Sequence, residues 1–286
     1  MTAIDAAQVS ALSDRVVGEV ERAIVGKRKL LEQIMAAVLS GGHVLMEDYP
    51  GLAKTLIAKS FAAALGLTFK RIQFTPDLLP GDITGGYVYQ RAPGTDTFRF
   101  VLRKGPIFAN IILADEINRA SPKTQSALLE AMQESQVTLE GETLALPSPF
   151  VVIATQNPIE YEGTFPLPEA QLDRFLMRLS VGYPTLDEEQ EILRRRQERR
   201  QDGFNLQQVA DAEALLEARQ TVEAIHVEPD LQRYNVALAA ETRDHREVAV
   251  GASPRGSLTL LKLSRAWAAL HDRDYVVPDD VKVFVK

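Results

Sequence analysis

The feature that most constrains this chain is a strand, a tight turn and a helix start that follow one another directly. Residues 43–46 have the character of a buried strand, residues 50–51 form a turn, and Lys54 and Thr55 open a helix. This order is typical of a phosphate-binding loop, in which backbone N–H groups, a lysine and a hydroxyl surround phosphate oxygens and Mg²⁺. A further strand at 69–74 completes a βαβ unit, so the sequence predicts an α/β fold with a parallel sheet.

The loop departs from the stricter pattern G-x-x-x-x-G-K-[ST] at both glycines. This chain has Asp48 and Ala53 at those positions. Aspartate tolerates unusual turn dihedrals, but its charge is costly near phosphates unless the side chain turns back onto N–H groups. Alanine is the smallest step from glycine, and we expect Ala53 to take a helical conformation at the first position of the helix. Alone, the loop leaves a phosphate site and an ordinary polar helix start equally open.

Polar residues also stand where later predicted strands end. Asp115 and Glu116 follow the apolar run 111–114, and Asn157 follows the next predicted strand. In open parallel sheets, ligands bind at the carboxyl ends of the strands. Asp115 is therefore a candidate Mg²⁺ ligand together with Thr55. Glu116 would polarise the attacking water, and Asn157 would contact a phosphate or that water. A solvated strand end and an asparagine that starts a turn are the alternatives.

Two arginines outside these strands stand at notable positions. Arg174 follows Asp173, with which it could form a surface pair. Arg255 opens a helix behind residues 253–254, where a cation opposes the helix macrodipole and an external anion would compensate it. The arginines between 194 and 200 are interleaved with glutamates, which favours an ion-paired helix face over a nucleic-acid surface.

The composition excludes several classes of protein. With 286 residues, 45% hydrophobic and 25% charged, the chain has the make-up of a globular protein of one large or two smaller domains. It has no cysteine, so disulfides and thiolate metal sites are excluded, and its four histidines show no metal-ligand spacing. The net charge of −7 argues against a broad nucleic-acid surface. Without an apolar leader or a membrane-length apolar run, we expect a soluble, cytoplasmic protein.

The pattern of elements changes at about residue 183. Before it, alternating segments predict two hairpins inserted between the strands, over 87–101 with a turn around residues 92–94, and over 137–146. The helices expected after it are 187–201, 208–219, 229–243 and 255–270, with another beginning at Pro278. We therefore expect an αβα sandwich over 1–183 and a small all-α domain over 184–286, whose last helix is cut short by the chain end.

Seven segments, in order, resemble the motifs of the MoxR family of AAA+ ATPases. They are IVG (24–26), EDYPGLAKT (47–55), QFTPDLLPGD (73–82), ADEINRA (114–120), ATQNP (154–158), LDRF (172–175) and SPR (253–255). Together they extend over nearly the whole chain, which makes the resemblance specific. It implies a P-loop sandwich with a helical lid, and the two hairpins resemble the helix-2 insert and the pre-sensor-1 hairpin of that clade.

The resemblance also implies an ATPase that uses ATP and Mg²⁺. The corresponding positions are Lys54 and Thr55 for Walker A, Asp115 and Glu116 for Walker B, Asn157 for sensor 1, Arg174 for the arginine finger and Arg255 for sensor 2. The nucleotide would contact Val25, Gly26, Tyr49, Pro50, Gly51, Leu52, Ala53, Lys54, Thr55 and Leu56, with Val25 and Gly26 flanking the adenine. If the arginine finger acts on a neighbouring subunit, the working unit is an oligomer, most often a hexamer in such proteins.

Three functions stay open on the sequence. The leading one is ATP-driven assembly or activation of a protein client, with a von Willebrand factor A-domain protein as the client class that the family implies. The second is a nucleic-acid motor of the same AAA+ clade, which the net charge and the acidic second hairpin tip (Glu140, Glu142) disfavour. The third is a scaffold that binds nucleotide without hydrolysis, suggested only by Asp48 and opposed by Glu116 and Arg174.

Overall fold

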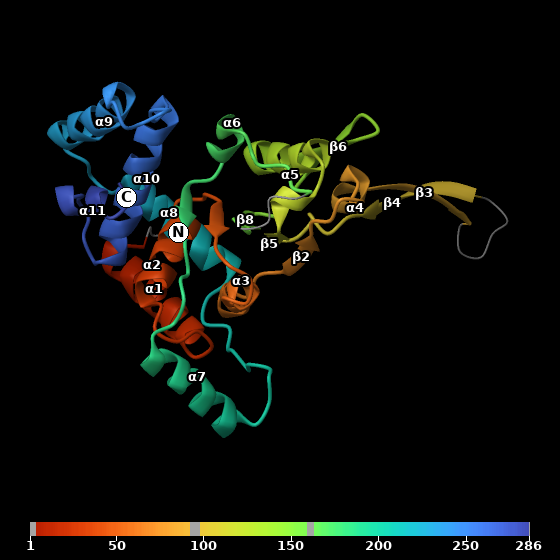
Figure 1. Ribbon diagram of the computed structural model, residues 1–286, viewed down its shortest axis with the longest axis horizontal. Coiled ribbons are helices and arrows are strands. Elements are labelled where there is room, and N and C mark those ends of the chain that lie inside the picture. Colours follow the sequence, from red (N-terminus) through yellow and green to blue (C-terminus); the bar gives the residue numbers. More distant parts are fainter. Residues whose placement is uncertain (1–3, 92–97, 159–162, 286) are drawn as a thin grey trace.

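The computed structural model describes residues 4–91, 98–158 and 163–285 (Figure 1). Its helices are α1 Ala6–Glu21, α2 Arg28–Leu39, α3 Lys54–Ala64, α4 Pro80–Thr84, the 3₁₀ turn η1 Ile117–Arg119, α5 Pro122–Glu134, α6 Glu169–Leu172, α7 Leu186–Arg199, α8 Ala212–Ala224, α9 Pro229–Asp244, α10 Pro254–Leu270 and α11 Pro278–Lys282. Its strands are β1 Val44–Glu47, β2 Phe69–Gln73, β3 Gly85–Arg91, β4 Phe98–Lys104, β5 Ile111–Asp115, β6 Gln136–Leu139, β7 Glu142–Ala145, β8 Val151–Gln156 and β9 Met177–Leu179.

The central sheet is parallel, with strand order β2-β5-β8-β1-β9. Strand β5 and the first five residues of β8 are fully buried, as expected for central strands covered on both faces. The register aligns Gln73 of β2 with Asp115 of β5, and Glu47 of β1 with Gln156 of β8. The carboxyl ends of four strands therefore meet at one edge of the sheet, where the predicted site residues stand.

Helices cover both faces of this sheet, which confirms the predicted sandwich. Alternate residues of β1 point to opposite sides: Val44 and Met46 belong to a core built with α1, α2 and α3. Leu45 between them belongs to a second core, which α5 closes through Leu128 and Leu129. Because β1, β5 and β8 each contribute residues to both cores, the site edge rests on a rigid scaffold.

The predicted helical part is confirmed, and its helices pack beside the amino-terminal ones (Figure 1). Helix α10 packs on α1 and α2, and Ser40 donates a hydrogen bond to the carbonyl of Lys262 at 3.2 Å. The second helix of this part begins at Ala212 rather than at the predicted 208. The carboxylate of Asp211 caps it by accepting a hydrogen bond from the Ala214 N–H at 2.9 Å.

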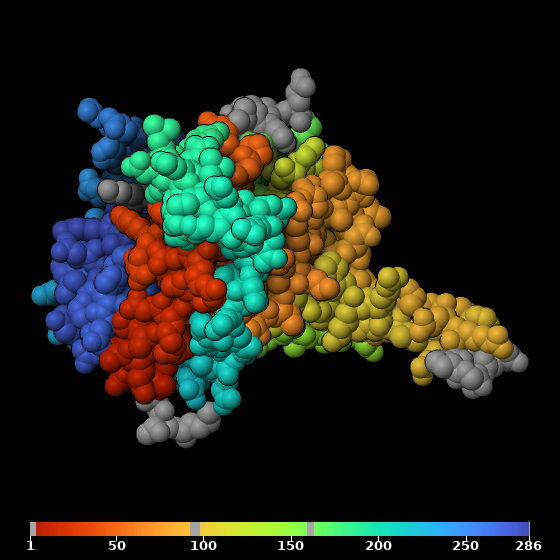
Figure 2. Space-filling model, turned by 90° about the horizontal axis from the view of Figure 1, so that it is seen from below, coloured from red at the N-terminus to blue at the C-terminus, as the bar shows by residue number. Residues whose placement is uncertain are grey.

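Both predicted hairpins are present, as β3–β4 and β6–β7. The first projects away from the body of the molecule (Figure 2), and the turn predicted around residues 92–94 lies outside the described residues. The two hairpins meet where the Tyr87 hydroxyl donates to Glu142 at 2.5 Å. None of the helices in the described ranges is both long enough and apolar enough to cross a membrane.

Candidate active site

A polar cavity of about 420 Å³ opens at the carboxyl edge of the sheet, beside the amino terminus of α3. It brings together most of the residues that the motifs predict: Pro50, Gly51, Leu52, Ala53, Lys54, Thr55, Leu56, Asp115, Glu116 and Asn157, with Arg71 and Thr155. The first turn of a helix leaves backbone N–H groups unpaired, and these attract anions. The cavity therefore combines a helix start with a lysine, a hydroxyl and two carboxylates.

The loop between β1 and α3 contains two residues in the left-handed region. Gly51 has φ of +84°, which suits glycine, and Ala53 has φ of +56° and ψ of +15°. The expectation that Ala53 would be helical is wrong: it caps α3 from outside, and its carbonyl accepts the Ile57 N–H at 2.9 Å. A left-handed conformation costs a residue with a Cβ about 1 kcal/mol. The glycine of the stricter pattern would avoid that cost.

The Asp48 side chain turns away from the polar cavity and is buried. One carboxylate oxygen accepts the Tyr49 N–H at 2.9 Å, and the other accepts the Ser180 hydroxyl at 2.8 Å and the Gly182 N–H at 2.7 Å. Burial raises the pKa of Asp48, but the hydrogen bonds from Gly182, Ser180 and Tyr49 outweigh it, so the pKa lies below its ordinary value. The charge is thus satisfied between the loop and the connection that leads to α7.

Lys54 is the cation of the loop. Its ammonium donates a hydrogen bond to the backbone carbonyl of Asp48 at 2.6 Å, which holds the side chain back along the loop. Burial lowers the pKa of Lys54, although nearby carboxylates, including Asp115 and Glu116, oppose this shift. A partly desolvated ammonium that faces two carboxylates interacts strongly with an anion that enters the same cavity.

Asp115 is held on both carboxylate oxygens. The Thr155 hydroxyl donates to Oδ1 at 2.6 Å and itself accepts the Glu116 N–H at 2.8 Å. Arg71 donates to Oδ2 from Nε at 3.0 Å and from Nη2 at 2.6 Å. The carboxylate therefore faces the cavity in one fixed orientation.

Glu116 stands one residue beyond β5, in the left-handed region with φ of +57°. This backbone conformation departs from the extended path of the strand. Its Oε2 accepts hydrogen bonds from Gln73 Nε2 at 2.7 Å and Arg119 Nη1 at 3.0 Å. The position suits a carboxylate that takes a proton from water, because the side chain lines the cavity and is held by two donors.

No group of three or more His, Cys, Asp and Glu side chains in residues 4–91, 98–158 and 163–285 could hold a metal ion by itself. Mg²⁺ is commonly bound through one or two carboxylates together with the phosphates of a substrate. Thr55 and Asp115 line the same cavity and are oxygen ligands of that kind. The donor set therefore fits an Mg²⁺ ion that is bound together with a nucleotide.

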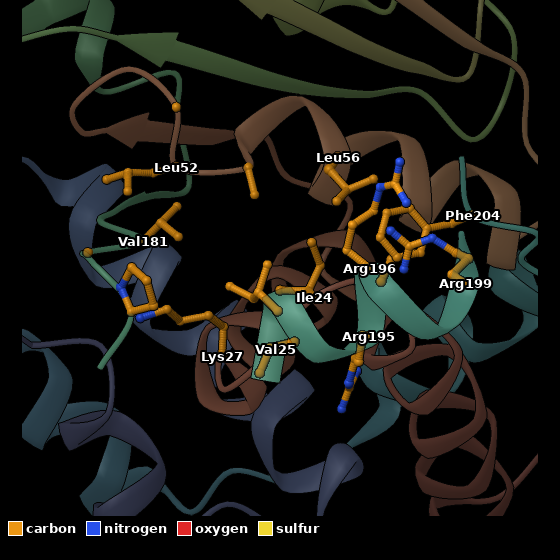
Figure 3. Close-up of a pocket in the computed structure, with 16 residues that line it drawn as sticks. Ile24, Val25, Lys27, Leu52, Leu56, Val181, Arg195, Arg196, Arg199 and Phe204 are labelled. Carbon is orange, nitrogen blue, oxygen red and sulfur yellow. The ribbon is translucent and has the colours of Figure 1, made fainter. Parts of the chain in front are cut away.

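An apolar cavity of about 340 Å³ lies next to the polar one and shares Gly51, Leu52, Ala53 and Leu56 with it. Side chains from distant parts of the chain surround it: Ala23, Ile24, Val25, Lys27, Val181, Gly182, Pro184, Ile192, Arg195, Arg196, Arg199 and Phe204 complete the lining. In Figure 3, Leu52 and Val181 lie at one side of it, and Arg196, Arg199 and Phe204 lie at the other. A mostly apolar cavity beside an anion site suits a nucleobase.

Helix α7 forms one wall of the apolar cavity. Arg195 ties it to the end of α1 through a hydrogen bond to the carbonyl of Glu21 at 2.8 Å. The Arg199 guanidinium lies 3.8 Å from the centre of the Phe204 ring, a cation–π contact. The prediction of an ion-paired arginine face is confirmed for Arg194, which bonds Glu191 at 2.7 Å. The same helix also has a second face that closes the cavity.

Some predicted nucleotide contacts lie elsewhere. Tyr49 packs on Tyr183, with ring centres 5.8 Å apart, and lines neither cavity. Val25 lines the apolar cavity, but the neighbouring Gly26 does not. Gly26 has φ of +71°, and a Cβ there would collide with the side chain of Glu188 on α7. Glycine at this position therefore allows α7 to approach.

Arg174 and Arg255 lie together, but not in the polar cavity. Both line another cavity, of about 290 Å³, to which Asp173 and Lys262 also contribute. Arg255 donates to the carbonyl of Asp173 at 3.4 Å. Within one subunit, neither arginine lines the polar cavity.

Comparisons with known proteins agree with this geometry. A model of the ATPase family associated with various cellular activities (AAA) matches residues 43–177, and a model of the AAA lid domain matches 240–286. Chaperone MoxR1 of Mycobacterium tuberculosis is 46% identical over 285 residues, which cover 96% of this chain and 74% of that protein. The chain belongs to the MoxR family of AAA+ ATPases. It is an ATP-binding enzyme that hydrolyses ATP.

Other relatives support the same family. The uncharacterized protein YeaC of Bacillus subtilis is 49% identical over 271 residues, covering 95% of this chain and 83% of that protein. Protein MoxR of Methylorubrum extorquens is 30% identical over 292 residues, covering 92% and 82%. A crystal structure from Cytophaga hutchinsonii, described as an inferred ATPase, superposes with a TM-score of 0.88 at 40% identity and covers 97% of this chain and 85% of that one.

Sequence reasoning missed several residues of this MoxR-family site. Arg71 and Gln73 contact the Asp115 and Glu116 carboxylates, and their spacing of two on a strand that ends at the site edge could have indicated it. Thr155 was missed as well, although it stands only two residues before Asn157. The contribution of α7 to the apolar cavity has no comparable signal, because it depends on where that helix packs.

Proposed function

We propose that this ATPase works as a homo-oligomeric ring that couples ATP hydrolysis to the assembly or activation of a protein client. The observation that carries the proposal is the division of the charged residues. The polar cavity holds Lys54, Asp115 and Glu116, whereas Arg174 and Arg255 lie in a separate cavity. Because Arg174 does not line the polar cavity of its own subunit, it acts as an arginine finger on the polar cavity of a neighbouring subunit.

The motif residues of the polar cavity have separate roles in this proposal. Lys54 and the helix start would hold the phosphates, and Thr55 and Asp115 would hold Mg²⁺, which when bound would neutralise charge on the phosphoryl oxygens. Glu116 takes a proton from the attacking water while the water oxygen forms a bond to the γ-phosphorus. At the same time, the bond between the γ-phosphorus and the bridging oxygen breaks. Asn157 orients that water or a γ-phosphate oxygen.

The nucleobase occupies the apolar cavity in this arrangement, with Val25 and Leu56 against it. Residues 1–183 then form the nucleotide-binding domain and residues 184–286 the lid. Helix α7, which begins the second of these ranges, forms a wall of that cavity, so nucleotide binding and the position of the lid are coupled.

Turnover is tested first with Glu116→Gln. The amide keeps the shape of the side chain and cannot accept a proton, so ATP should still bind while hydrolysis falls at least a hundredfold. The matched control is Glu130→Gln, which makes the same change at an exposed position of α5 and should leave turnover unchanged. Normal turnover in Glu116→Gln would remove Glu116 from the proposed chemistry.

The shared site is tested by mixing inactive variants. Arg174→Ala subunits keep an intact polar cavity, and Lys54→Ala subunits keep an intact arginine. Mixed rings contain interfaces where both are present, so mixing should restore part of the ATPase rate. A mixture as inactive as its components would contradict an arginine supplied by the neighbour. Light scattering of each variant with ATP shows whether the ring itself still forms.

The client is sought with the Glu116→Gln protein, which should stay in the ATP-bound state. Affinity capture with ATP, compared with capture by Lys54→Ala, should enrich a protein client, with von Willebrand factor A-domain proteins as the first class to examine. Enrichment of nucleic acid instead would favour the motor alternative. The acidic tip at Glu140 and Glu142 of the second hairpin gives that alternative no support.

A further inference from the structure

Arg71 carries a charge at the site that the motif roles do not use. It lies on the edge strand β2 and lines the polar cavity with its side chain about half exposed. Its guanidinium makes two hydrogen bonds to a single atom, Oδ2 of Asp115, and Nη2 also donates to Gln73 Oε1 at 2.6 Å. A planar guanidinium in this forked arrangement is a strong partner for a carboxylate.

The second oxygen of Asp115 is already engaged. Oδ1 accepts the Thr155 hydroxyl, and that hydroxyl is fixed in turn by the Glu116 N–H. Oδ2 is therefore the oxygen that either the Arg71 guanidinium or a divalent metal ion could contact. Arg71 occupies it in this structure, and a divalent ion held by Asp115 would need the same negative charge.

The charges that line the polar cavity also balance through Arg71. Lys54 and Arg71 stand against Asp115 and Glu116, so the formal charges of these four side chains cancel. Removing Arg71 would leave the cavity with one excess negative charge. That excess repels the phosphates of a metal-free nucleotide and attracts a divalent cation.

From this arrangement we propose that Arg71 sets the metal dependence of nucleotide binding, because its guanidinium and Mg²⁺ compete for Oδ2 of Asp115. Arg71 keeps Asp115 neutralised until the metal arrives, and it supports phosphate binding when no metal is present. This inference rests on the proposed role of Asp115 as a metal ligand.

The test is equilibrium binding of a fluorescent ADP analogue, N-methylanthraniloyl-ADP, which the enzyme does not hydrolyse. It is titrated into wild type and Arg71→Ala in EDTA and at a series of Mg²⁺ concentrations. Without metal, Arg71→Ala should bind the analogue about fivefold more weakly. The Mg²⁺ concentration that gives half of the metal-dependent gain should fall about fivefold, since the pair is partly exposed and worth less than a buried one.

Two further variants separate the effect of the forked contact from the effect of charge. Lys70→Ala removes a cation from the adjacent position of β2, where the exposed side chain points to the opposite face of the strand. Lys70→Ala should change neither the affinity for the analogue without metal nor the Mg²⁺ concentration that gives half of the metal-dependent gain. Arg71→Lys keeps the charge without the fork and should give values between those of wild type and Arg71→Ala.

Each other outcome contradicts the proposal in a different way. Weaker binding by the same factor with and without Mg²⁺ would mean that Arg71 contacts the phosphates or only supports the fold. Unchanged binding in Arg71→Ala, confirmed as folded by its thermal unfolding, would mean that the two cations do not compete.

Asp115→Asn shows which proposal fails. If that variant keeps the wild-type response to Mg²⁺, the assignment of Asp115 as a metal ligand is wrong. If it loses the response while Arg71→Ala keeps the wild-type one, only the competition is wrong.

Discussion

The polar and apolar cavities share the loop 51–53 but are built in different ways. The polar cavity takes its side chains from the carboxyl ends of neighbouring parallel strands, whose register places Asp115 beside Gln73. The apolar cavity takes its side chains from the α1–α2 connection, from the end of β9 and from α7, far apart in the sequence. The residues proposed to act in hydrolysis thus stand on the sheet, whereas the cavity proposed to hold the nucleobase is formed by helix packing.

The largest expected loss of ATP affinity follows from replacing a residue that lines only the polar cavity. Lys54→Ala should weaken ATP binding by two to three orders of magnitude, because the charge-assisted hydrogen bonds to phosphate are lost. Inorganic tripolyphosphate, which has no base, should lose affinity by a similar factor in calorimetric titrations. Lys59→Ala removes an exposed lysine from the same helix and should change neither affinity. If Lys54→Ala weakened the binding of ATP but not of tripolyphosphate, Lys54 would not be the residue that holds the phosphates.

The scaffold below the polar cavity should be sensitive to pH through His43. This buried imidazole accepts the Val152 N–H at Nδ1 and faces the carbonyl of Met132 through Nε2, both at 3.0 Å. Burial lowers its pKa to about 4. Between pH 6.5 and 4 the unfolded chain takes up a proton that the folded one does not. As the pH is lowered from 6.5 to 4, the free energy of unfolding should therefore decrease, by up to about 3 kcal/mol in total from this group.

His43→Asn keeps an acceptor for the Val152 N–H but cannot be protonated. Denaturant unfolding between pH 7 and 4.5 should show a shallower loss of stability than in wild type. His245→Asn, the same change at an exposed position, should follow the wild-type slope. Equal slopes in all three proteins would mean that the folded protein accommodates a charged His43.

The sheet-based half of the site could be predicted from sequence because its signals are local. The apolar run before Asp115 and Glu116 predicts the strand, and the two carboxylates mark where it ends. Parallel pairing brings such strand ends together. The sandwich, the two hairpins and the helical lid follow from the same periodicities. Ala53 escaped prediction, because a left-handed alanine opposes the local preference and is held by the loop around it.

The helix-based half could not be predicted in this way. The pattern of α7 indicates a solvated helix, and indeed none of its residues is buried. Its role comes from contacts distant in sequence, such as Arg195 with the carbonyl of Glu21 and Glu188 over Gly26. The direction of the Asp48 side chain is of the same kind, since its partners Ser180 and Gly182 are far along the chain.

Asp48 joins the two halves, so its replacement should affect both. Three donors face two carboxylate oxygens, and in Asp48→Asn the amide NH₂ would face one of those donors. The free energy of unfolding should fall by about 2 kcal/mol. Affinities for ATP and tripolyphosphate should both fall, because the loop is anchored less firmly. Asp244→Asn, at an exposed position, is the control. A stable variant with normal affinities would show that the anchor is dispensable.

The smallest effect should fall on the apolar cavity alone. Ile192 lines that cavity from α7 and is 43% exposed, so Ile192→Ala removes only part of a contact with the base. ATP affinity should fall about fivefold, whereas tripolyphosphate affinity should stay unchanged. Leu193→Ala is the matched control, since the next residue on the same helix lines neither cavity and is 67% exposed. If tripolyphosphate binding fell as well, α7 would influence the loop, and the two cavities would respond as one site.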